Sequence, residues 1–120
     1  MLMLPEPIRI FLRREPTDMR LGYDGLAALA RNHFGQNPTS GHLFVFVNKG
    51  RNRSKMLLWE RGGFWLFSRR LEQGTFALPD ALKDGAPTVD RVAFSMFLDG
   101  VMAENIRRKK RYFPVADSAS

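Results

Sequence analysis

Three short runs of apolar residues in the middle of the chain alternate with turn-forming residues. The runs lie at 42–47, 55–60 and 63–68. The first is rich in β-branched and aromatic residues and ends at Asn48-Lys49-Gly50, which is typical of a strand followed by a turn. The link 61–63, Arg-Gly-Gly, is short enough to force a tight hairpin between the other two runs. The pattern predicts an antiparallel β-meander.

One more strand and a helix are predicted before the meander. Residues 8–12 form a β-branched run that stops ahead of Pro16, so they are expected to form a strand. Asp24 is a candidate N-cap for a helix that Gly35 ends. The apolar face of that helix is predicted to hold Leu26, Leu29, Ala30, His33 and Phe34, with His33 packed as a structural residue.

A second helix is predicted near the end of the chain. Thr88 or Asp90 can cap it, and Gly100 ends it. Its polar positions, Arg91, Ser95 and Asp99, lie four residues apart and form a narrow stripe. We therefore expect this helix to be mostly buried.

These elements together predict an α+β fold. A chain of 120 residues is long enough for one domain with a real core. We expect an antiparallel sheet of about four strands with two packed helices, forming one domain over residues 1–106. Residues 107–120 are predicted to be a basic, flexible C-terminal tail.

The first meander strand is apolar on both faces. Leu43, Val45 and Val47 point to one face, whereas Phe44 and Phe46 point to the other. A sheet with one wet face would alternate apolar and polar residues. Either both faces are covered by the protein itself, or one face is an interface for a partner or a second copy of the chain.

The composition gives the chain a strong positive charge. Nineteen Lys and Arg residues against twelve Asp and Glu residues give a net charge of +7, with a pI near 10.6. A polyanion such as DNA is therefore a candidate partner, against the alternative of a basic protein that binds no nucleic acid. No apolar run approaches the roughly 20 residues that cross a bilayer, and no signal peptide is evident, so we expect a cytoplasmic protein.

The turn at 48–55 is the first candidate binding feature. It carries four cations and two asparagines but no acid. Its candidate phosphate-binding residues are Lys49, Arg51, Asn52, Arg53 and Lys55. The alternative is a solvated turn whose charges protect a hydrophobic sheet from aggregation.

The tail is the second candidate, with five consecutive cations followed by Tyr112 and Phe113. The cations are Arg107, Arg108, Lys109, Lys110 and Arg111. Such a stripe is expected to bind nucleic acid without sequence preference and with steep salt dependence, or else to act as a solubilising tail. Arg69 and Arg70, at the end of the third run, are given a supporting role.

Candidate catalytic groups are sparse. The carboxylates are scattered, and the chain has no cysteine and no phosphate-binding loop of the Walker or dinucleotide type. A zinc site would have to rely on His33, His42 and carboxylates, which is a poor set for a structural metal. We therefore expect a protein that is not an enzyme and that has no catalytic residue, metal or cofactor.

Several stretches, in the same order along the chain, carry a resemblance to a known family. They include Pro-Thr-Asp-Met-Arg at 16–20 and further stretches at 22–29, 41–46, 55–60, 63–64, 69–72 and 98–100, together with Gly74, Phe76 and Pro79. In these the chain resembles the small accessory protein, often called TnpB or the second-open-reading-frame protein, of the sixty-six family of bacterial insertion sequences. The resemblance covers nearly all of residues 8–100.

The resemblance implies a role in DNA transposition beside a separate, larger transposase that carries the nuclease chemistry. It supplies no catalytic residue for this chain. Two functions remain open at this point. The protein binds DNA phosphates without sequence preference and assists the transposase, or it is an interaction module that binds the transposase or itself through an apolar sheet face.

Overall fold

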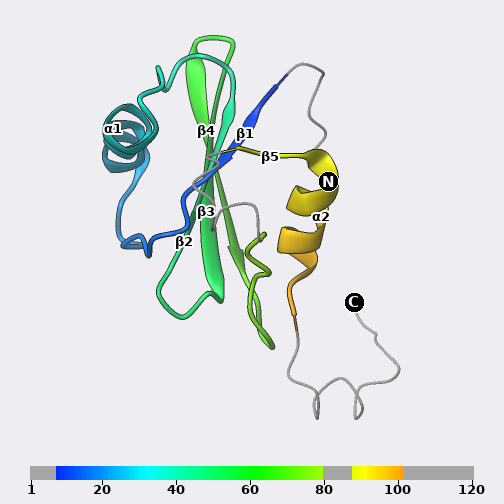
Figure 1. The fold of residues 1–120 in the computed structure, drawn as a ribbon. Coiled ribbons are helices and arrows are strands. Elements are labelled where there is room, and N and C mark those ends of the chain that lie inside the picture. The colour runs from blue at the N-terminus through cyan, green and yellow to red at the C-terminus, as the bar shows by residue number, and fades with distance from the viewer. Residues whose placement is uncertain (1–7, 80–87, 102–120) are drawn as a thin grey trace.

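The computed structural model describes residues 8–79 and 88–101. They form one mixed five-stranded sheet with a helix on each face (Figure 1). The elements in chain order are β1 (Ile10–Leu12), α1 (Tyr23–Phe34), β2 (Leu43–Val47), β3 (Arg53–Glu60), β4 (Gly63–Arg70), β5 (Thr88–Val89) and α2 (Arg91–Asp99). The strands lie side by side in the order β4-β3-β2-β1-β5. The predicted α+β fold with two helices is confirmed.

The meander has the predicted antiparallel pairing. Leu43 lies opposite Leu58 in the pairing of β2 with β3, and Leu57 lies opposite Leu66 in that of β3 with β4. Glu60 lies opposite Gly63, so only Arg61 and Gly62 form the turn, both with positive φ. A two-residue turn of this kind matches the twist of the strands that it joins.

The first strand departs from the expectation of a purely antiparallel sheet. β1 pairs in parallel with β2, because α1 lies between them in the chain and carries it back across one face of the sheet. Thr88, a candidate helix cap, instead lies in the short strand β5, which pairs with β1 in antiparallel orientation. This fifth strand has only two residues, too few for a periodic pattern in the sequence.

Some of the predicted residues cap or end the two helices, and one does not. Asp90 caps α2, with its Oδ1 accepting a 2.7 Å hydrogen bond from the Ala93 backbone. Gly35 ends α1 in the left-handed conformation, as predicted. At the start of α1, however, Gly22 is the N-cap, and Asp24 lies in the first turn, where a carboxylate still favours the helix dipole.

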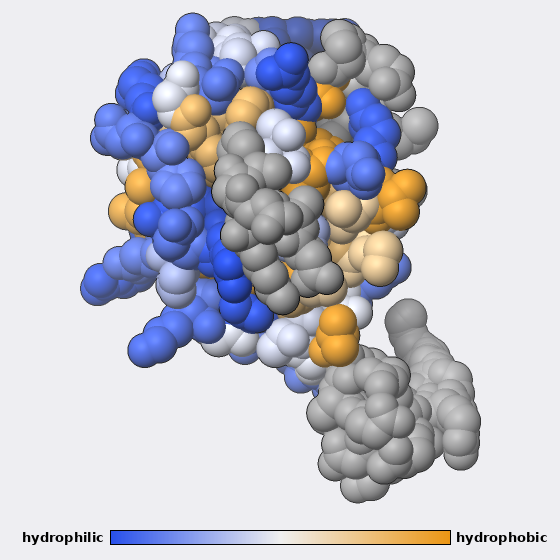
Figure 2. Space-filling view, viewed as in Figure 1, coloured by the Kyte–Doolittle hydropathy of each residue, from blue (hydrophilic) through white to orange (hydrophobic). Residues whose placement is uncertain are grey.

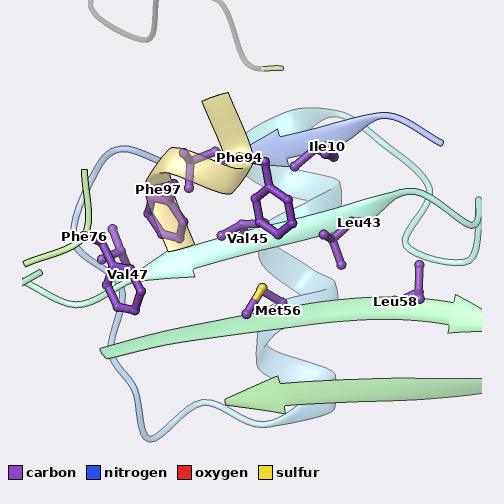
Figure 3. Close-up of a cluster of buried hydrophobic side chains, with 10 residues drawn as sticks. Ile10, Leu43, Val45, Val47, Met56, Leu58, Phe76, Phe94 and Phe97 are labelled. Carbon is purple, nitrogen blue, oxygen red and sulfur yellow. The ribbon is translucent and has the colours of Figure 1, made fainter. Parts of the chain in front are cut away.

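Both faces of the central strand are covered, which decides between the two readings of its apolar pattern. Every residue of β2 is buried. On one face, α1 packs on the sheet in a cluster of Phe11, Leu26, Ala27, Ala30, Phe44, Phe46 and Leu57. On the other face, α2 and residue 76 complete a cluster of Ile10, Leu12, Leu43, Val45, Val47, Met56, Leu58, Phe76, Phe94 and Phe97 (Figure 3).

Two burial predictions are wrong. α2 is not mostly buried, because only Phe94 and Phe97 are buried and Leu98 is partly buried, while Val92 is 70% and Met96 61% exposed. His33 does not pack in the core. It lies at the surface with Nε2 3.7 Å from Glu15 Oε1, and its ring makes a T-shaped contact with the ring of Phe34. In both cases the apolar stripe read from the sequence is wider than the row of side chains that one helix can press against a sheet.

Candidate nucleic-acid interface

Most of the predicted phosphate-binding residues inside the described part of the chain meet at one end of the sheet. The turn between β2 and β3, at the lower end in Figure 1, lies beside the last residues of β4. Arg53 stands opposite Arg70 in the strand register, and Arg69 stands opposite Ser54. We call this region, made by residues 48–53 and 69–70, the basic end.

The turn at the basic end is held by the side chain of Asn48. Its Oδ1 accepts hydrogen bonds from the backbone N–H groups of Asn52 and Arg53, both at 3.0 Å. Its Nδ2 donates to Asn52 Oδ1 at 2.8 Å. The Arg51 N–H donates to the Asn48 carbonyl, and Arg51 takes a left-handed φ of 58°. The turn is therefore a closed structure, which we call the Asn48 clasp.

A second segment of the chain anchors the clasp from outside. Residue 71 donates its N–H to the Asn52 carbonyl at 2.8 Å, and Phe76 donates to the Arg51 carbonyl at 2.7 Å. Phe76 is buried and its ring stacks on Phe97 of α2 at a centroid distance of 4.7 Å. The backbone that presents the cations is thus tied to the core beneath α2.

The cations themselves point outward. Lys49, Arg51, Arg53 and Arg69 are exposed, and their side chains have no ion pair or hydrogen bond with other residues in the ranges 8–79 and 88–101. Arg70 pairs with Glu72, with Nε 3.0 Å from Oε2. Figure 2 shows hydrophilic side chains extending from this lower part of the molecule.

The pairing of Arg53 with Arg70 places two positive charges opposite each other on neighbouring strands. Like charges directly opposite each other on neighbouring strands destabilise a sheet. Glu72 offsets this for Arg70, but Arg53 has no such partner within the described residues. An anion bound between the two guanidinium groups would remove the repulsion.

Two of the predicted residues have internal roles. Lys55 is half-buried, and its Nζ donates to the Leu21 carbonyl at 2.9 Å, next to the start of α1. Asn52 accepts from Asn48 through its side chain and from residue 71 through its carbonyl. Phosphate contacts by these two residues stay predictions, and so do contacts by Arg107, Arg108, Lys109, Lys110 and Arg111, which lie outside the described residues.

The structure also brings the stretch 13–20 close to the basic end, which sequence spacing did not predict. The N–H groups of Arg13 and Thr17 donate to the carbonyls of Val45 and Val47, so this segment runs beside the end of β2. Arg13 Nη1 in turn donates to the Pro16 carbonyl and to Thr17 Oγ1. In the sequence, the Pro-Thr-Asp-Met-Arg motif marked this stretch as distinctive. A motif alone does not show where the stretch lies in the fold.

Asp18 lies in the same stretch and forms an ion pair with Arg20. Arg20 donates to both carboxylate oxygens, with Nη2 to Oδ2 at 2.8 Å, and its backbone N–H donates to Oδ1. These hydrogen bonds, with a smaller contribution from Lys55, lower the pKa of Asp18 to about 2. The carboxylate is therefore ionised, with Arg20 as its partner.

Residues 8–79 and 88–101 contain no group of three or more histidines and carboxylates placed to hold a metal ion. Neither described helix has the length and apolar character needed to cross a lipid bilayer.

Comparison with known proteins decides the family. The profile of the family described as "IS66 Orf2 like protein" matches residues 8–108, which is most of the chain. The chain belongs to the IS66 Orf2-like family. This family consists of accessory proteins of transposition, so the chain is the accessory protein of an insertion sequence, as the sequence motifs indicated.

Two relatives of this IS66 Orf2-like chain come from Sinorhizobium fredii (strain NBRC 101917 / NGR234). The uncharacterized protein y4jC is 33% identical over 102 residues, covering 85% of this chain and 86% of the relative. The uncharacterized protein y4hO is 36% identical over 103 residues, covering 82% and 87%. No solved structure matches the chain.

Proposed function

We propose that the protein is a non-catalytic accessory protein of transposition that binds DNA phosphates without sequence preference through its basic end and assists a separate, larger transposase. The observation that carries this proposal is the Asn48 clasp. It holds Lys49, Arg51 and Arg53 on a fixed backbone with no acidic partner among the described residues. Fixed cations of this kind match a chain of phosphates.

The electrostatics of the basic end support an anionic ligand. Among the described residues, Glu72 is paired with Arg70, and Asp18 is paired with Arg20. The opposed pair of Arg53 and Arg70 is a repulsive arrangement that a bound phosphate would relieve. The proposal extends the contact to Arg69 and to the cations 107–111.

The salt dependence of binding tests the electrostatic mechanism. Fluorescence anisotropy of the full chain on a labelled duplex, repeated across salt concentrations, gives the slope of log affinity against log salt. Neutralising four or five phosphates predicts a slope of about −4. Duplexes carrying the end of the insertion sequence and a scrambled sequence should bind equally well.

A matched pair of variants locates the contact. Lys49→Gln, Arg51→Gln and Arg53→Gln together should weaken binding and make the slope shallower by about 3, because each cation accounts for about 0.9. Replacing Arg9, Arg31 and Arg61 by Gln removes the same charge from exposed positions away from the basic end and should leave the slope nearly unchanged. Equal effects of the two triples, or no binding at low salt, would contradict the proposal.

The exposed side chains of α2 support a second candidate, an interaction module. Val92 and Met96 lie one helical turn apart and present an apolar strip to solvent. In this case the protein binds the transposase through that strip, and its charge is incidental. Binding of the transposase that survives the Lys49/Arg51/Arg53 triple, but not Val92→Ser with Met96→Ser, would favour this candidate.

A further inference from the structure

β4 forms one edge of the sheet. It has eight residues and pairs on one side with β3, and in the described part of the chain no strand lies on its other side. An edge strand of this length presents a row of free backbone groups that another strand can pair with.

The register shows which backbone groups are free. The N–H of residue 71 donates to the Asn52 carbonyl, so these two residues form a hydrogen-bonded pair, and such pairs alternate along an antiparallel ladder. The groups of Phe64, Leu66, Ser68 and Arg70 therefore point away from β3. None of these four N–H groups has a partner among the described residues.

The side chains of β4 are arranged asymmetrically along the strand. Phe64 and Trp65 stand at its beginning, Arg69 and Arg70 at its end, and Phe67 lies near the middle. Trp65 is 54% exposed, and its ring stacks on that of Phe67 at 6.1 Å. Charges and proline are common devices in edge strands that avoid pairing, whereas the first five residues of β4 carry neither.

We propose that β4 pairs in antiparallel orientation with β4 of a second copy of this chain, about a two-fold axis at Phe67. A two-fold axis perpendicular to the sheet leaves each side chain on the same face of the sheet in both copies. Two residues can therefore lie opposite each other only if their side chains are on the same face. Pairing about Phe67 places Phe67 opposite its own copy, and it places Arg69 opposite Trp65 and Arg70 opposite Phe64 of the second copy.

This register is favoured by the chemistry of the pairs. Each guanidinium lies across from an aromatic ring, with which it can form a cation–π contact, and no two cations stand opposite each other. Pairing about Leu66 would instead put Arg69 opposite Gly63 and leave Arg70 without a partner on the other strand. The aromatic start and the cationic end make the strand complementary to itself, which identifies a second copy as the occupant.

The pairing joins the two sheets edge to edge and leaves both helices of each copy in place. It goes beyond the proposed DNA contact and does not depend on it. In the paired form Arg69 and Arg70 lie opposite aromatic residues of the second copy, and Lys49, Arg51 and Arg53 stay exposed at the two far ends of the joined sheet.

Sedimentation velocity with two substitutions at one position tests the pairing. Ser68→Pro removes an outward N–H while keeping the ladder to β3, because Ser68 is exposed and its N–H points away from that strand. Ser68→Ala keeps the N–H. We expect a dimer for the wild type and for Ser68→Ala, and a folded monomer for Ser68→Pro. A monomeric wild type, or a dimeric Ser68→Pro, would overturn the proposal.

Cysteine cross-linking tests the register. The chain has no cysteine, so one introduced thiol can pair only with its copy. Phe67 falls in a non-hydrogen-bonded pair with Cα atoms about 4.5 Å apart, within disulfide reach. Phe67→Cys should therefore form a covalent dimer under mild oxidation, and Ser68→Cys, shifted two residues from its copy, should not.

Circular dichroism would show whether each cysteine variant is folded. A dimer that cross-links through Leu66→Cys and not through Phe67→Cys would show a different register and overturn the one proposed here. If Phe67→Cys does not fold, sedimentation of Ser68→Pro and Ser68→Ala still decides whether the chain dimerises through the β4 edge.

Discussion

The two turns of the meander connect the same sheet but are built differently. The turn between β3 and β4 consists of Arg61 and Gly62, both with positive φ, and a side-chain hydrogen bond beside it joins the strands, from Trp65 Nε1 to Glu60 Oε1 at 3.1 Å. The turn between β2 and β3 is longer, and the side chain of Asn48 and the segment 71–76 hold it in place. The shorter turn only reverses the chain. The longer one also holds the backbone that carries three cations, Lys49, Arg51 and Arg53.

The largest effect is expected from breaking the Asn48 clasp. Asn48→Ala removes three hydrogen bonds and leaves two backbone N–H groups unpaired, which should lower the free energy of unfolding by about 2 kcal/mol. It should also weaken DNA binding without changing the charge. Urea denaturation and anisotropy measure the two effects.

Asn32→Ala is the control for this substitution. Asn32 is exposed on α1, and its side chain makes no hydrogen bond with other described residues, so stability should change by less than about 0.5 kcal/mol. If Asn48→Ala and Asn32→Ala bind DNA equally well, a fixed turn is not needed for binding.

A smaller effect is expected at the short turn. Gly62→Ala must hold a φ of 84°, which should cost about 1 kcal/mol of stability, although nothing lies within 4 Å of the added Cβ. Gly63→Ala meets equally open space without a positive φ and should be nearly neutral. Thermal unfolding compares the two. DNA affinity should be unchanged in both, and a loss of affinity in Gly62→Ala would extend the interface to this turn.

The smallest effect is expected at low pH. The pKa of Asp18 falls from its ordinary value of 3.8 to about 2 in the folded protein. Its ionised form therefore stabilises the fold above pH 3.8, and this contribution is lost as the pH falls towards 2. Melting temperatures measured from pH 5 to 2 should show a weaker acid-induced loss in Asp18→Asn. Arg20→Gln should show the same weaker loss, because Arg20 is the main cause of the shift. If the melting temperatures of both variants fall as steeply between pH 5 and 2 as that of the wild type, this account is contradicted.

Local rules in the sequence were enough to predict much of the fold. The meander, the short hairpin, the Gly35 stop and the Asp90 cap follow from turn and cap chemistry that acts over a few residues. The parallel pairing of β1 and the strand β5 depend on contacts between distant segments, which no local pattern specifies. For the same reason, the exposure of Val92 and Met96 could not be read from their apolar character.

The candidate site also combines features that local sequence predicts with features that depend on contacts between distant segments. Composition identified the basic turn, and the register brought Arg69 and Arg70 to it. Lys55 was grouped with the other cations by spacing, yet its ammonium group bonds to the Leu21 carbonyl, thirty-four positions away. Asn48, read as one more polar turn residue, proves to organise the turn through bonds that only the folded backbone makes available.

The anchoring of this turn through Phe76 has a thermodynamic consequence for any ligand that binds there. The backbone of Arg51 is already fixed in the free protein by its hydrogen bond from a buried residue, so binding need not order the loop. Coupled folding, which produces a large negative heat-capacity change, is therefore not expected from this part of the chain. Calorimetry over a range of temperatures should then find a binding enthalpy that hardly changes with temperature, with affinity set mainly by the release of counterions.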